Sequence, residues 1–115
     1  YVLPDLFAGK MHALLCRRWK NRVKGRDWYD LVWYCAHHPD MHLAHLEERM
    51  RQSGHWEKAA PLDTKTFNNL LLNAIRNLDI HQAKEEVLPF VRVPAVLDIW
   101  SQEFFQEIIK KVRIV

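Results

Sequence analysis

The segment KGRDWYDLVWYCAHH, residues 24–38, predicts a helix around which the other parts of the chain pack. Gly25 marks a turn, Asp27 lies at the start of the helix, and the helix ends at about His37, before Pro39. A carboxylate suits the first turn because free N–H groups and the positive end of the helix dipole lie there. The residue before a proline disfavours helical backbone, so the helix is expected to end just before Pro39.

One polar stripe runs along this apolar helix. At about 100° per residue, the spacing i, i+3, i+7, i+10 places four polar side chains on one side. They are Asp27, Asp30, Tyr34 and His37, with Arg26 beside them. The remaining positions are mostly aromatic or aliphatic, which is typical of a helix buried on most sides. Buried carboxylates need a charged partner or a function, so the stripe requires an explanation.

Composition predicts the fold class. A chain of 115 residues is the size of one domain. Its apolar content of 49% argues for a folded core and against disorder. With only three glycines and five prolines, the chain is expected to consist of helices with short connections. We therefore expect an all-α bundle of five to six helices in a single domain, residues 1–115.

Capping residues and apolar spacing locate the other helices. Asp5 is expected to cap a first helix that runs to about Trp19. A third helix is predicted from Pro39-Asp40 to Gly54, where glycine suits the position just after a helix end.

Similar signals mark the second half of the chain. Asp63 is expected to cap a fourth helix, and Asp79 with Gln82 resembles a capping box for a short fifth helix. Pro94 suits the first position of a final helix, which Ser101 either recaps or kinks.

Positive charge is concentrated in one segment. The net charge of +3 is mild, but six cations and no acidic residue occur between residues 17 and 26. They are Arg17, Arg18, Lys20, Arg22, Lys24 and Arg26. This basic patch is either a phosphate-facing surface that binds RNA or a solvated helix end, where cations are favoured.

The two cysteines show no motif for a metal site or a disulfide. Cys16 and Cys35 lie in apolar helical patterns without a CxxC partner, so we expect reduced core thiols in a cytoplasmic protein. There is no signal peptide, and no apolar run near the roughly 20 residues that span a bilayer, so no membrane association is expected. Because the chain begins at Tyr1 without a methionine, we expect a fragment or a trimmed protein.

A group of histidines and one carboxylate follows the central helix. It comprises His37, His38, Asp40, His42 and His45. His42 and His45 are spaced i, i+3, which is compatible with metal binding. No H-E-x-x-H motif or cysteine pair supports this, so surface histidines are the alternative, and no metal site is assigned.

Arg26, Asp27 and Asp30 allow two interpretations. In a structural one, Asp27 caps the helix and Arg26 pairs with Asp30 at i, i+4. In a functional one, Asp27 or Asp30 is a general base or orienting carboxylate, and Arg26 and Lys10 hold phosphate oxygens. Lys10 lies at the edge of the apolar stripe of the first helix, on one line with Arg17. It either presents its ammonium to a cleft or lies along the surface.

Two separated motifs resemble the nucleotidyltransferase AbiEii/AbiGii toxin family. LFAGKMHALL at residues 6–15 is similar to a family helix with a lysine, here Lys10, and KGRDWYDL at residues 24–31 is similar to a second family motif. QSGHW at residues 52–56 and VLPF at residues 87–90 are weaker matches. The resemblance therefore spans nearly the whole chain. The chain itself has no Walker A motif, no G-x-G-x-x-G motif and no Asp-x-Asp pair.

The resemblance implies a two-lobed enzyme. Its N-terminal α/β lobe has a Gly-Ser turn and paired metal-binding aspartates, and a helical C-terminal lobe follows. This chain corresponds to the helical lobe alone. The family consists of toxins of bacterial toxin–antitoxin and phage-abortive systems, with nucleotide transfer to RNA as the implied activity.

Site residues, cofactor and partner follow from the same resemblance. Asp27 and Asp30 are the implied catalytic carboxylates, and Lys10, Arg26 and Arg17 are the implied nucleotide-binding cations. The cofactor is a nucleoside triphosphate with Mg, bound only with the other lobe, and the partner is an antitoxin protein. We expect no nucleotidyl transfer from this chain alone. The alternatives are a non-catalytic helical module that binds an antitoxin or RNA, and an inactive truncated remnant.

Overall fold

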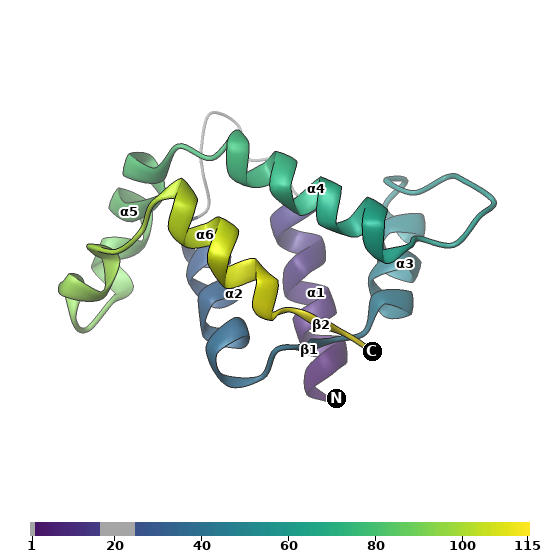
Figure 1. The fold of residues 1–115 in the computed structure, drawn as a ribbon, viewed down its shortest axis with the longest axis horizontal. Coiled ribbons are helices and arrows are strands. Elements are labelled where there is room, and N and C mark those ends of the chain that lie inside the picture. The colour runs from purple at the N-terminus through teal and green to yellow at the C-terminus, as the bar shows by residue number, and fades with distance from the viewer. Residues whose placement is uncertain (1, 17–24) are drawn as a thin grey trace.

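The computed structural model describes residues 2–16 and 25–115. Within these residues the chain forms six α-helices and one pair of two-residue strands (Figure 1). The helices are α1 (Leu3–Cys16), α2 (Gly25–His37), α3 (Leu43–Gln52), α4 (Thr64–Arg76), α5 (Ile80–Val87) and α6 (Gln102–Ile108). Short 3-10 helices cover Leu88–Phe90, Pro94–Leu97 and Ile109–Lys111. The prediction of a single, essentially all-α domain is confirmed.

Helix α1 occupies the centre of the domain. It packs against α2 on one side and α3 on the other, while α5 packs on α2 and α6 packs on α4 (Figure 1). The core is built from aromatic and long aliphatic side chains of these helices. Its largest fully buried members are Phe7, Phe67, Phe105, Met11, Leu31, Met41, Leu46, Leu71, Ile75 and Val87. No polar or charged residue of the described part of the chain is buried.

Helix α2 is less buried than its composition predicts. Trp28 and Leu31 enter the core, but Trp33 is 41% exposed. Tyr34, expected in the polar stripe, is instead buried, and its ring stacks on that of Phe7 at a centroid distance of 4.7 Å. Asp27 and Asp30 are half-buried and His37 is exposed. The predicted polar stripe is therefore interrupted by an apolar contact.

The expected cysteine chemistry agrees with the structure. Cys16 and Cys35 are free and buried. Burial raises the pKa of Cys35 to about 12, an effect that Lys111 partly offsets. The thiol of Cys35 therefore remains protonated and unreactive.

The third helix begins later than predicted, because the chain first forms a strand. β1 (Asp40–Met41) pairs in parallel with β2 (Arg113–Ile114), with Asp40 opposite Arg113. The Pro39 carbonyl accepts the Arg113 N–H at 2.9 Å, so the backbone that would have started a helix binds the C-terminal segment. The Asp40 carboxylate also accepts a hydrogen bond from Arg113, which lowers the pKa of Asp40.

The first helix begins earlier than predicted. α1 starts at Leu3, so Asp5 lies in its first turn and is not the N-cap residue. The Asp5 carboxylate instead accepts a hydrogen bond from His42 Nδ1 at 2.7 Å. The expected end near Trp19 lies outside the described residues.

The later caps are confirmed, with one change of boundary. Asp63 accepts the Thr66 N–H at 2.7 Å, and Asp79 accepts the Gln82 N–H at 3.0 Å. The helix predicted from Pro94 is instead a 3-10 turn that ends at Leu97. Ser101 then caps α6 by accepting the Phe104 N–H at 3.0 Å, so the recapping alternative is correct.

Gly25 has a different role from the predicted turn. It is the first residue of α2 and lies against α5, where an added Cβ would be 2.0 Å from the Ala83 carbonyl oxygen. Only a residue without a side chain permits this approach, because backbone atoms of α5 cannot yield as a flexible side chain would.

We predict that Gly25→Ala lowers the free energy of unfolding by about 1–3 kcal/mol, the usual cost of inserting an extra group into a packed interface. Urea denaturation followed by circular dichroism measures this. Gly9→Ala is the control, since a Cβ there would meet the Arg49 guanidinium carbon at an ordinary 3.7 Å. Gly9→Ala should not lower the stability, because alanine stabilises a helix relative to glycine by about 1 kcal/mol. Equal stability of Gly25→Ala and the parent chain would contradict the close contact.

Glu47 ties the connection between α3 and α4 to α3. Its carboxylate accepts the Leu62 N–H at 2.7 Å and the Arg51 Nε–H at 3.0 Å. These two hydrogen bonds, the first more than the second, lower the pKa of Glu47. A lowered folded-state pKa contributes stability above the pKa of the unfolded chain, and this contribution is lost as the pH falls through the folded pKa.

Glu47→Gln should therefore lower stability at neutral pH, and its difference from the parent chain should shrink as the pH falls below about 4.3, the ordinary glutamate pKa. Denaturation curves from pH 7 to acid measure this difference. Glu48→Gln is the matched control because its side chain is exposed on the same helix. A difference that stays constant with pH would show that the charge of Glu47 has no part in it.

Candidate active site

The two sequence motifs meet at the interface of α1 and α2. Lys10 extends from the middle of α1, and its Nζ lies 3.1 Å from Asp30 Oδ2 on α2. The two side chains are 50% and 36% exposed, so the ion pair lies at the rim of the interface and faces solvent. The structure thus brings together a cation and a carboxylate that are 20 residues apart in the sequence.

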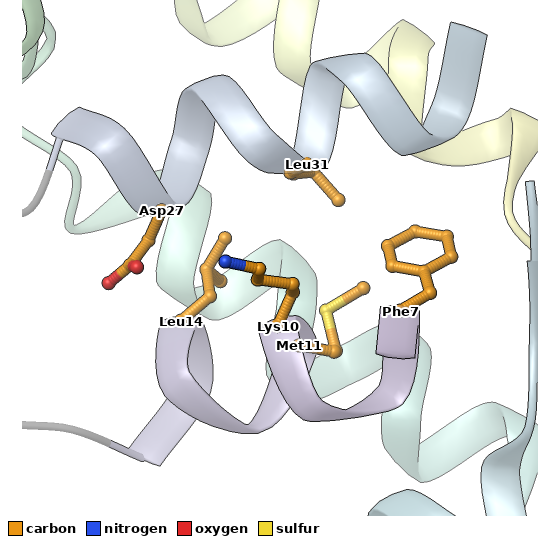
Figure 2. A pocket seen from close by; sticks show the side chains of 6 residues that line it. All are labelled: Phe7, Lys10, Met11, Leu14, Asp27 and Leu31. Carbon is orange, nitrogen blue, oxygen red and sulfur yellow. The ribbon is translucent and has the colours of Figure 1, made fainter. Parts of the chain in front are cut away.

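Apolar residues hold the stem of Lys10. The side chain lines a narrow hollow with Phe7, Met11, Leu14 and Leu31 (Figure 2). Figure 2 shows the ammonium end of Lys10 directed toward the end of α2 that carries Asp27. Apolar contacts along the stem fix its direction, while the charged end stays accessible. Of the two interpretations of Lys10, the structure favours the one that presents the ammonium to a cleft.

A wider cleft opens beside this hollow, between α1, α2 and α3. Its volume is about 300 Å³. Lys10 and Asp27 line it together with groups from α1 and α3 that the sequence analysis did not propose as nucleotide-site residues. These are Asp5, Leu6, Gly9, Ala13, His45 and Arg49. The cleft therefore has two permanent cations, one histidine and two carboxylates on its walls.

The guanidinium of Arg49 lies beside Gly9 of α1 at this cleft. A Cβ at Gly9 would lie 3.7 Å from two atoms of the Arg49 guanidinium, so the guanidinium lies against the backbone of α1. His45 precedes Arg49 by one helical turn and lines the same cleft. Lys10 and Arg49 can each donate hydrogen bonds to an anionic group such as a phosphate, and Asp5 and Asp27 line the same cleft.

A family comparison connects these residues to a known class of proteins. A model described as "Nucleotidyl transferase AbiEii toxin, Type IV TA system" matches residues 1–105. The chain belongs to the AbiEii family. Comparisons with curated proteins and with solved structures gave no significant match. Family membership implies a nucleotide substrate with a metal ion and a cognate antitoxin.

In this AbiEii chain, three of the four predicted site residues that the structure describes meet and one does not. Lys10, Asp27 and Asp30 surround the junction of α1 and α2. Arg26 points elsewhere, with its guanidinium carbon 4.6 Å from the centre of the Phe90 ring. The structural alternative in which Arg26 pairs with Asp30 is therefore replaced by the Lys10–Asp30 pair.

Most of the basic patch lies outside the described residues. These cations are Arg17, Arg18, Lys20, Arg22 and Lys24. Contacts of Arg17 with a nucleotide and of the patch with RNA therefore remain predictions. None of the described helices is both long and apolar enough to cross a bilayer.

His42 and His45 both lie close to the carboxylate of Asp5. His42 Nδ1 and His45 Nδ1 lie 2.7 and 4.0 Å from the same oxygen of Asp5. Across residues 2–16 and 25–115, neither histidine belongs to a group of three potential metal ligands. His42 instead links the start of α3 to the first turn of α1, and His45 contributes to the cleft.

Arg49 and His45 were missed because nothing local distinguishes them. Their i, i+4 spacing shows that they share a helix face, but only the packing of α3 on α1 places that face at the cleft. The glycine of the LFAGK motif is the one available signal, since a glycine inside a helix is often associated with a close approach.

We predict that the Lys10–Asp30 pair contributes little to folding. Half-exposed ion pairs typically contribute about 0–1 kcal/mol, so Lys10→Met and Asp30→Asn should each change the free energy of unfolding by less than about 1 kcal/mol. A double-mutant cycle in urea measures the coupling between the two side chains. The more exposed pair Lys110–Glu107 on the C-terminal segment is the matched control. A loss of several kcal/mol would identify the pair as a structural element.

Proposed function

We propose that this chain supplies one wall of a nucleotide-transfer site, in which Lys10 binds phosphate oxygens and Asp27 and Asp30 act beside the reacting groups. The observation that carries the proposal is the Lys10–Asp30 pair, 3.1 Å apart at the rim of an open cleft that Asp27 also lines. These charges contribute little to a buried core, because none of them is fully buried. Their position at the cleft is consistent with a role in ligand binding.

The residues present fit the phosphates of a nucleoside triphosphate. Lys10 offers an ammonium with three donors and Arg49 a planar guanidinium, and both line the same cleft. The volume of about 300 Å³ is at the lower end of small-molecule sites. It accommodates the charged part of a nucleotide more readily than the whole molecule. We propose that a second lobe of the family's two-lobed enzyme encloses the remainder.

Asp30 keeps the Lys10 ammonium directed across the helix interface. When a phosphate chain enters, Lys10 exchanges part of its contact with Asp30 for charge-assisted hydrogen bonds to phosphate oxygens. Lys10 thereby holds the phosphates in one orientation and stabilises negative charge that develops on them.

Asp27 is the better placed of the two carboxylates for proton transfer. It lines the cleft, and Asp30 does not. We propose that Asp27 accepts the proton of the attacking hydroxyl as a general base. Magnesium bound with the nucleotide would neutralise phosphate charge, and its carboxylate ligands belong to the second lobe in this proposal. An RNA acceptor and an antitoxin partner are part of the same proposal.

Nuclear magnetic resonance tests the proposal directly. Titration of the chain with Mg-nucleoside triphosphates should shift the amide signals of Lys10, Asp27, Asp30 and Arg49. Lys10→Ala should weaken binding roughly 10- to 100-fold, because a hydrogen bond to a charged group contributes about 1.5–3 kcal/mol. Lys110→Ala should bind as the parent chain does.

Three outcomes would contradict the proposal. They are no shift at saturating nucleotide, shifts confined to residues away from the cleft, and equal affinity of Lys10→Ala and Lys110→Ala. Asp27→Asn separates the two roles, because it should retain nucleotide binding while removing a base. A complete two-lobed protein that carries Asp27→Asn should accordingly lose nucleotide transfer with little change in nucleotide affinity.

A further inference from the structure

A second group of reactive side chains lies where the C-terminal half of α1 meets the end of α3. His12 and Cys16 are one helical turn apart, and His55 follows the end of α3. One ligand atom from each of the three residues lies within 4.8 Å of the other two. None of the three residues lines the cleft that contains Lys10 and Arg49. We therefore treat this group as a separate candidate site.

The end of α3 fixes the position of His55. Gly54 has a φ of 78°, a conformation that glycine adopts without strain, and it reverses the chain after the helix. The N–H groups of His55 and Trp56 both donate to the Met50 carbonyl, at 2.8 and 3.2 Å. Trp56 is buried, so the backbone on both sides of His55 is held in place. His55 can therefore act as a positioned ligand while its ring stays exposed.

Ser53 holds the two imidazole rings next to each other. Its hydroxyl donates to the Met50 carbonyl at 3.2 Å, and the same Oγ lies 3.0 Å from His12 Nε2 and 2.7 Å from His55 Nδ1. The hydroxyl oxygen therefore lies between the two rings, within hydrogen-bond distance of one nitrogen of each. Such an oxygen commonly orients the rings of metal-binding histidines.

The donor set selects the kind of metal. Two imidazoles and one thiolate suit Zn²⁺, which prefers nitrogen and sulfur ligands in tetrahedral geometry. Bonds of about 2.0–2.3 Å place such ligand atoms roughly 3.3–3.8 Å apart. A separation of up to 4.8 Å is therefore closed by small side-chain rotations. Solvent reaches the site beside exposed His55, so water is able to supply the fourth ligand.

We propose that His12, Cys16 and His55 bind a zinc ion that links α1 to the segment following α3. Binding replaces the thiol proton of Cys16, which leaves to solvent, and both imidazoles bind as neutral rings. Burial raises the pKa of Cys16, so the thiol is protonated before metal enters. The zinc site holds the end of α1 against the Gly54 turn.

Cobalt tests the site because Co²⁺ replaces Zn²⁺ and reports thiolate ligation by a charge-transfer absorption band. Titration of the apo chain should show one equivalent of Co²⁺ bound with this band, and Zn²⁺ should abolish it. Cys16→Ser should lose the band, whereas Cys35→Ser, which alters the other buried free cysteine, should keep it. Circular dichroism establishes that each variant is folded.

His55→Ala provides a second test at an exposed position where folding is not at risk. Its affinity for Zn²⁺ should fall at least about 100-fold, and its thermal stability should no longer rise with added Zn²⁺. His81→Ala, at a histidine 84% exposed on α5, should behave as the parent chain does. The proposal is overturned by absence of Co²⁺ binding, by binding without the thiolate band, or by unchanged Zn²⁺ affinity in His55→Ala.

Discussion

The stacking of Phe7 on Tyr34 sets the register between α1 and α2, and the candidate site depends on that register. The two buried rings lie 4.7 Å apart with an angle of 10° between their planes. Residues that follow Phe7 on α1 consequently meet residues that precede Tyr34 on α2. Lys10, one turn after Phe7, reaches Asp30, one turn before Tyr34. Asp27 follows one turn further along the same interface.

This arrangement separates the parts that stabilise the fold from the parts available to a ligand. Apolar burial supplies most of the stability of a small domain, and the α1–α2 contact is apolar at Phe7, Met11 and Leu31. The charged groups lie where the interface opens to solvent. A ligand can therefore exchange contacts with Lys10 without unpacking the core. The third wall comes from α3, whose Arg49 lies beside Gly9 of α1.

Contacts between distant backbone segments explain where local signals failed. The predicted helix start at Pro39 gave way to β1, since the carbonyls of Pro39 and Met41 accept N–H groups from the C-terminal residues Arg113 and Val115. Gly25 was predicted to mark a turn, but its lack of a side chain permits the contact with Ala83 on α5. Helix propensity is a weak preference that such tertiary contacts override.

The sequence by itself determined the all-α class, the caps at Asp63 and Asp79, and the two motifs that carry the family resemblance. Caps and helical periodicity arise from groups three or four residues apart, so they are readable without a fold. Only the tertiary structure decided that Asp30 pairs with Lys10 rather than Arg26. It likewise assigned Arg49 to the cleft and brought His12 beside His55. These pairings depend on the register and crossing of helices, which are set by packing among residues far apart in the chain.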